Sequence, residues 1–191
     1  MRQSPAQIDH AILDVAARLF ATHGYAHTSV QQIADAVGYS KPGLLHRFGS
    51  KEALHRAALA EVTETVQAVI GHATAHDDDP DQVHRVLELV TRKALARPGM
   101  VQMMVAAFEP GSEEPGTSEI QAAGRRLVEL LDHPPTGPAD RLRVVLAMRM
   151  IATAAMAQSS PASTSLHVDP GELVPLLVDI AAQVMGAPRR R

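Results

Sequence analysis

Apolar side chains near the start of the chain recur in steps of three and four residues. They occupy Ile8, Ile12, Val15, Ala16, Leu19 and Phe20. This spacing places them along one face of a helix, and Gly24 is a suitable residue to end that helix. The pattern therefore predicts a first amphipathic helix that stops before residue 24.

The next apolar period is shorter and begins with residues that cap helices. Thr28 and Ser29 are each followed three residues later by a glutamine, which is the spacing of a capping box. A helical stripe then runs through Val30, Ile33, Ala34 and Val37. Because Gly38 follows directly, we expect a second, short helix over residues 30–37.

A third short helix is expected directly after the second. Ser40 can cap it, and Pro42 is tolerated in a first turn, where backbone N–H groups have no partner within the helix. Leu44 and Phe48 are four residues apart and should face inward. Ser50 then begins a fourth, longer stripe that continues to about residue 75.

The rest of the chain is also helical in pattern. A polar stretch at 76–81 predicts a loop, and further helices are expected at about 82–97, 99–108, 119–132, 138–158 and 171–186. No alternating run of β-branched residues indicates a strand. The sequence therefore predicts an all-α fold of about nine helices.

Composition limits the kind of protein and its compartment. The 191 residues include no cysteine, which excludes disulfides and zinc–thiolate sites and fits a reducing cytoplasm. The start of the chain has no basic segment followed by an apolar run, so no signal peptide is predicted. No apolar window is long enough to predict a transmembrane helix. We therefore expect a cytoplasmic protein.

Charge is divided unevenly along the chain, whose formal net charge is −3. Residues 1–56 hold six Lys/Arg against four Asp/Glu, a net of +2, and residues 57–191 hold twelve against seventeen, a net of −5. A basic head on an acidic body would favour a polyanion locally. Chance alone could also produce so small an excess.

Two short helices joined by a tight turn at 38–40 suggest a helix-turn-helix, whose second helix enters the DNA major groove. A helical projection of residues 41–48 turns Leu44 and Phe48 inward and puts Leu45 at the edge. The outward positions are Pro42, Gly43, His46 and Arg47. The two basic side chains could bind phosphates, Arg47 could alternatively read guanine, and Leu45 could touch a thymine methyl group. Lys51 could bind a phosphate at a helix start or be an ordinary solvated lysine.

The segment TSVQQIADAVGYSKPGLLHRFGSKEAL, residues 28–54, resembles the DNA-binding segment of TetR-family transcriptional regulators, and AILDVAARLFATHGYAHTSV, residues 11–30, is similar to that family's first helix. The resemblance covers about 50 residues. It implies a homodimeric repressor with a helix-turn-helix DNA-binding domain over residues 1–50. A helical ligand-binding and dimerisation domain over residues 51–188 would follow.

Position by position, the resemblance places DNA contacts on the residues of the second, third and fourth helices. Together with Arg47 from the helical projection, the candidate DNA-binding residues are Thr28, Ser29, Gln31, Lys41, Pro42, Gly43, Leu45, His46, Arg47 and Lys51. Two positions depart from the family, which usually has Thr or another hydrogen-bonding residue at Gly43 and Tyr at Leu45. Both departures remove polar contacts.

The body offers a candidate site for a small apolar effector. Methionine suits adaptable apolar pockets, although it also simply fills cores. The candidate lining residues are Met100, Met103, Met104, Phe108, Met148 and Ile151. The long apolar helices at about 138–158 and 171–186 could form a four-helix homodimer interface, or both could be buried within one protomer.

The interpretation that follows is a ligand-responsive repressor that binds a palindromic DNA operator as a homodimer. No nucleophile motif, P-loop or motif-placed carboxylate pair is present, so we expect no enzyme, no cofactor and no metal. One alternative is a dimeric helical interaction module with weakened DNA binding, suggested by Gly43 and Leu45. A less favoured one is a metal-dependent helical enzyme, based on His72, His76, Asp77, Asp78, Asp79, Asp81 and His84.

Overall fold

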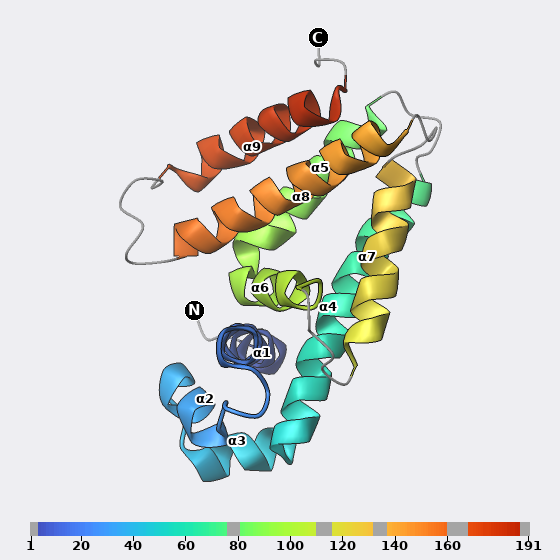
Figure 1. Ribbon diagram of the computed structural model, residues 1–191. Coiled ribbons are helices and arrows are strands. Elements are labelled where there is room, and N and C mark those ends of the chain that lie inside the picture. The colour runs from blue at the N-terminus through green and yellow to red at the C-terminus, as the bar shows by residue number, and fades with distance from the viewer. Residues whose placement is uncertain (1–3, 76–80, 110–115, 132–136, 160–167, 188–191) are drawn as a thin grey trace. The chain divides into compact units, whose positions relative to one another are not determined.

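The computed structural model describes residues 4–75, 81–109, 116–131, 137–159 and 168–187. Over these residues the chain forms nine helices and no strand (Figure 1). They are α1 Pro5–His23, α2 Val30–Val37, α3 Lys41–Phe48, α4 Lys51–Thr74, α5 Gln82–Ala96, α6 Pro98–Ala106, α7 Thr117–Leu131, α8 Pro138–Ser159 and α9 Pro170–Met185. The all-α prediction is confirmed.

The chain divides into two compact units. The first unit comprises residues 1–63 and 97–120, and the second unit comprises 64–96 and 121–191. Helix α6, which the sequence assigned to the body, therefore belongs to the same unit as α1, α2 and α3. The expected boundary at residue 50 concerns where the DNA-binding function ends, and it stays a prediction.

Local side-chain caps explain where the first three helices begin. Ser4 and Gln7 form a capping box at the start of α1, and Ser29 and Gln32 form another at the start of α2. Ser40 caps α3 by accepting a hydrogen bond from the Gly43 N–H at 3.2 Å. Each cap satisfies backbone groups that the helix itself leaves without partners, which stabilises a helix by about 1 kcal/mol.

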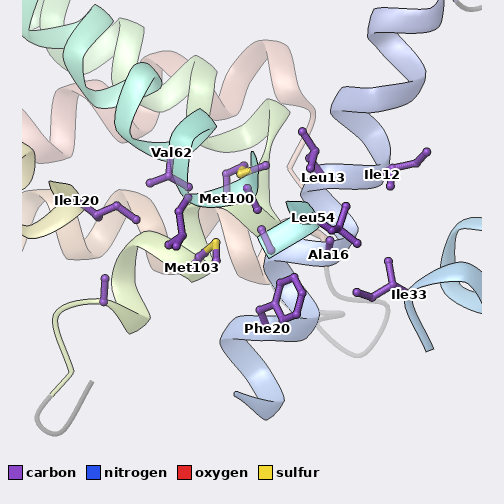
Figure 2. Packing of buried hydrophobic residues seen from close by; sticks show 14 of the residues in the cluster. Ile12, Leu13, Ala16, Phe20, Ile33, Leu54, Val62, Met100, Met103 and Ile120 are labelled. Atoms are coloured by element: carbon purple, nitrogen blue, oxygen red, sulfur yellow. The ribbon is translucent and has the colours of Figure 1, made fainter. Parts of the chain in front are cut away.

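The core of the first unit gathers around α1. Phe20 and Ile12 are each 2% exposed, and Ile33 of α2 is fully buried beside them (Figure 2). Met100 and Met103 bring α6 into the same cluster. Burying one such side chain contributes about 1.5–3 kcal/mol. This shared core holds the short helices α2 and α3, which could not be stable alone.

Helices α1 and α6 approach each other backbone to backbone. A Cβ atom added to Gly99 would lie 2.0 Å from the carbonyl oxygen of Asp14. The carboxylate of Asp14 also accepts a hydrogen bond from the Met100 N–H at 3.0 Å. The residue before α6, Arg97, makes no side-chain cap of its own, so α1 supplies the cap for α6.

The second unit is built around the packing of α5, α8 and α9, which lie against one another in Figure 1. Leu87 of α5, Ile151 of α8 and Ala181 of α9 are at most 1% exposed. Both α8 and α9 also carry exposed apolar side chains, which are Leu142, Val145, Leu146, Leu176 and Ile180. None of the described helices combines the length and apolar character needed to cross a membrane.

Candidate nucleic-acid interface

The turn between α2 and α3 fixes the angle at which α3 leaves α2. Gly38 adopts a left-handed conformation, with φ 72° and ψ 28°, which glycine reaches at little cost. The Tyr39 N–H donates a hydrogen bond to the Ala34 carbonyl at 2.9 Å, and Ser40 then caps α3. This arrangement ends one helix and starts the next within three residues, as a helix-turn-helix requires.

Helix α3 is held by one face and leaves the other accessible. Leu44 is 1% exposed, and Phe48 packs against the core of the first unit. Lys41, Pro42 and His46 are exposed, whereas Gly43 and Leu45 are partly covered. The inward and outward faces expected from the helical projection are therefore present for these residues.

Arg47 is exposed, as expected, but its guanidinium is engaged by α1. Its Nε forms an ion pair with the Asp9 carboxylate, and one Nη donates to the Pro5 carbonyl at 2.8 Å. Both partners lie in the first turns of α1. The hydrogen bond to Asp9 is the main cause that raises the pKa of Arg47. The guanidinium therefore ties α3 to α1, and its role in DNA binding stays a prediction.

Thr28 and Ser29 have separate roles at the start of α2. The Thr28 side chain is 1% exposed, and its hydroxyl donates to the carbonyls of Leu19 at 3.1 Å and Gly24 at 2.9 Å. Thr28 thus fixes the loop between α1 and α2 from inside. Ser29 is exposed and caps α2 together with Gln32.

Gln31 and Lys51 are the remaining candidates outside α3. The Gln31 amide donates to the Asp35 carboxylate at 2.6 Å on the exposed side of α2. The Lys51 ammonium lies 4.2 Å from the centroid of the Tyr25 ring and 3.5 Å from the Ala26 carbonyl oxygen. This cation–π contact holds the charge at the α1–α2 loop, where it can meet an anion.

Residues 12–58 match the family model described as bacterial regulatory proteins, tetR family. The first unit contains all of them, including the α2–turn–α3 arrangement. This segment of the chain belongs to the TetR family. The fold agrees, since a TetR-family transcriptional regulator from Bordetella parapertussis superposes with a TM-score of 0.64 at 22% identity, covering 96% of this chain and 98% of that one.

Other relatives support the same assignment. A TetR-family transcription regulator from Marinobacter aquaeolei superposes with a TM-score of 0.58 at 25% identity, covering 96% and 98% of the two chains. The HTH-type transcriptional repressor AcnR of Corynebacterium efficiens is 39% identical over 66 residues, which are 32% of this chain and 35% of that protein. The HTH-type transcriptional regulator RutR of Escherichia coli is 43% identical over 54 residues, 28% and 26% of the two chains.

These sequence matches are confined to a part of each protein. The chain spans about a third of the length of the first curated relatives that it matches. The matched part includes the TetR-family head, where α3 lies. The body of this chain resembles the solved TetR-family structures in fold alone.

Sequence reasoning missed a polar cluster where α1, α4 and α6 meet in the first unit. Arg97 Nη1 lies 2.5 Å from Glu61 Oε1 and 3.0 Å from His10 Nδ1, and His10 also pairs with Glu61. Burial alone would raise the pKa of the Glu61 carboxyl, but the hydrogen bonds and charges of Arg97 and His10 outweigh burial and lower it. No local pattern marks these residues, because they meet only across 36 to 87 positions of sequence.

The candidate effector residues fall in both units. In the first unit Met100 and Met103 are each 5% exposed core residues, Met104 packs on the same core, and Phe108 is 40% exposed. In the second unit Ile151 is 1% exposed and Met148 is half-buried. Their common role as an effector pocket stays a prediction.

The histidine- and aspartate-rich stretch is only partly described. His76, Asp77, Asp78 and Asp79 lie outside the described residues. His84 is buried at 3% exposure within α5. Among the residues that the structure describes, no three histidine or carboxylate side chains come together as metal ligands.

Proposed function

We propose that this chain is a transcriptional regulator, most simply a repressor, that binds DNA with α3 in a major groove. The observation that carries the proposal is the exposed outer face of α3, set at a fixed angle by the turn after α2. Lys41 and His46 supply cationic or hydrogen-bonding groups on that face, and helix-turn-helix proteins read bases with such residues. The repressor names of relatives such as AcnR support the same direction of control.

In this proposal the candidate residues divide into two groups. Lys41, Pro42, Gly43, Leu45 and His46 face the groove, and Ser29, Gln31 and Lys51 lie where phosphates would approach. Thr28 and Arg47 act as positioning residues, because both form hydrogen bonds with α1 or the loop that follows it. The small outer surface at Pro42 and Gly43 lets the helix backbone come close to the bases.

A homodimer through α8 and α9 is the second part of the proposal. Leu142 and Leu146 of α8 are 57% and 52% exposed, and Leu176 of α9 is 49% exposed. These side chains lie on the faces that α8 and α9 do not use to pack within the second unit. Two copies of this helix pair would bury them in a four-helix interface. A two-fold dimer would match a palindromic operator, with half-sites about 34–36 Å apart.

The dimer can be tested without DNA. Leu146→Glu should shift the protein from dimer to monomer in sedimentation velocity, because a charge would be buried in an apolar interface. Ala122→Glu adds the same charge to an exposed position of α7 and should leave the dimer intact. A Leu146→Glu protein that stays dimeric would exclude this interface.

An apolar effector completes the proposal. Within the first unit, its proposed contacts are Met100, Met103, Met104 and Phe108. The effector would release DNA only if it binds the non-binding conformation more tightly than the DNA-binding one, because equal affinity shifts no equilibrium. Added fatty acyl compounds should then raise the apparent dissociation constant for DNA, and Met103→Ala should reduce that effect.

The deciding experiment is a DNA-binding measurement at two salt concentrations, with the duplex that flanks the gene for this chain. Lys41→Ala and His46→Ala should weaken binding without lowering the thermal midpoint, because both side chains are exposed. Binding of the wild type should fall steeply with salt as counterions are released. An intact dimer that binds no promoter-like duplex would favour the interaction module instead, which the missing polar groups at Gly43 and Leu45 would then explain.

A further inference from the structure

Tyr39 is an aromatic residue in an exposed turn, and the function proposed above does not use it. Its side chain is 36% exposed, although the residue at this place after a helix usually packs its side chain back onto the helix. The backbone on both sides is fixed, by the hydrogen bond from the Tyr39 N–H to Ala34 and by the Ser40 cap. A large amphipathic ring is therefore held at a defined place on the surface of the head.

The Tyr39 ring lies against the first turn of α3. A Cβ atom at Gly43 would lie 3.9 Å from Tyr39 Cδ1 and 3.1 Å from Ser40 Oγ. Such a Cβ would be at ordinary van der Waals distance from the ring and in a tighter contact with Ser40 Oγ. With glycine at position 43, no side chain covers this edge of the Tyr39 ring.

The position of Tyr39 is at the edge of the outer face of α3. Gly43 and Arg47 are one helical turn apart and share that edge. The nearby Tyr39 contributes to the raised pKa of Arg47, after the larger effect of the hydrogen bond that Arg47 donates to Asp9. Because Arg47 is engaged with α1, the exposed Tyr39 can supply a hydrogen-bonding hydroxyl at this edge.

We propose that Tyr39 contacts a DNA phosphate through its hydroxyl and is a binding residue of the interface. The inference rests on the function proposed above, since it needs α3 to lie in the groove. Residues of the recognition helix itself point to base edges, whereas hydroxyls and amides beside it commonly meet phosphate oxygens. The backbone of Tyr39 is fixed before binding, and a tyrosine side chain has only two χ angles, so the contact costs little conformational entropy.

The test compares Tyr39→Phe with the wild type on two duplexes. One is selected by the wild-type protein from a random-sequence pool, and the other is a scrambled duplex of equal length. Removing this hydrogen bond to a charged phosphate should weaken binding by about ten- to hundredfold, equally for both duplexes. The thermal midpoint should not change, because Phe keeps the ring packing. The salt slope, which is the slope of the logarithm of the binding constant against the logarithm of the salt concentration, should not change either. The hydroxyl carries no charge, so its contact releases no counterion.

Two charge variants make the outcomes distinguishable. Lys41→Ala should weaken binding to the selected duplex, because Lys41 lies on the outer face of α3, whereas Lys93→Ala in α5 should leave DNA binding unchanged. If Lys41→Ala weakens binding and Tyr39→Phe does not, the proposed contact between Tyr39 and a phosphate is wrong. The proposed DNA-binding function of α3 then stands. If Tyr39→Phe weakens only the selected duplex, the hydroxyl reads a base and the phosphate contact is wrong. A wild type that enriches no duplex overturns both proposals.

Discussion

The carboxylate of Asp14 on α1 accepts a hydrogen bond from the backbone N–H of Met100 on α6, with Oδ1 3.0 Å from the nitrogen. Met100 lies in the first turn of α6, where N–H groups have no partner within the helix. The same carboxylate oxygen lies 3.6 Å from Arg97 Nε. One side chain of α1 thus caps another helix and attracts the arginine that precedes it.

Asp14→Ala should lower the free energy of unfolding by about 1–2 kcal/mol, the usual loss for a helix cap. Asp14→Asn should cost less, because the amide oxygen can still accept from Met100 while the attraction to Arg97 is lost. Urea unfolding followed by circular dichroism measures both. Equal losses for Asn and Ala would mean that charge, and not capping, is what Asp14 provides.

Gly99→Ala should be severely destabilising, because the new Cβ would lie 2.0 Å from the Asp14 carbonyl oxygen. Backbone shifts that relieve such overpacking cost about 1–3 kcal/mol or more. Gly71→Ala in α4 is the matched control, since a Cβ there meets nothing within 4 Å. That substitution should stabilise the protein by about 0.5–1 kcal/mol through helix propensity. Thermal unfolding of the two variants should therefore change in opposite directions.

Arg47 and Asp9 offer a test of positioning against direct contact. If Arg47 only positions α3, then Arg47→Ala and Asp9→Ala should weaken DNA binding to a similar degree, and the double variant should be no worse than either single variant. The salt slope should stay constant in all three proteins. A slope that falls by about one in Arg47→Ala alone would show that the guanidinium leaves Asp9 and binds a phosphate.

Acidification should weaken the polar cluster around Glu61. Its pKa is lowered in the folded protein, so Glu61 contributes stability above the pKa of an unfolded glutamate, about 4.3. That contribution is lost as the pH falls through the lower folded value. Glu61→Gln should cost about 1–3 kcal/mol at pH 7, and its stability should approach that of the wild type below about pH 4. Urea unfolding between pH 3 and pH 7 measures the difference; one that is constant with pH would contradict the assignment.

Helix positions could be predicted because the signals that set them are local. Ser29, Gly38 and Ser40 define the ends of α2 and the start of α3 through hydrogen bonds within a few residues. The inward face of α3 was equally predictable, since Leu44 and Phe48 follow the helical period. The family assignment also depended on this local segment.

The roles of Thr28 and Arg47 could not be predicted, because both depend on distant partners. Thr28 and Ser29 have the same capping-box spacing, and only the fold shows that Thr28 is bound to Leu19, nine residues earlier. Arg47 lies on the flank of α3, and its partner Asp9 is 38 residues away. Helical projection describes one helix and gives no information about which neighbour covers its flank.

The backbone contact at Gly99 has a mechanical consequence for the first unit. Most pairs of helices meet through side chains, which can change rotamer and absorb a small displacement. At Gly99 no side chain separates α6 from the Asp14 carbonyl of α1, so there is nothing compressible between the two helices. A displacement of α6 toward α1 at Gly99 therefore has to move α1 as well. The two helices can separate at this contact but cannot come closer.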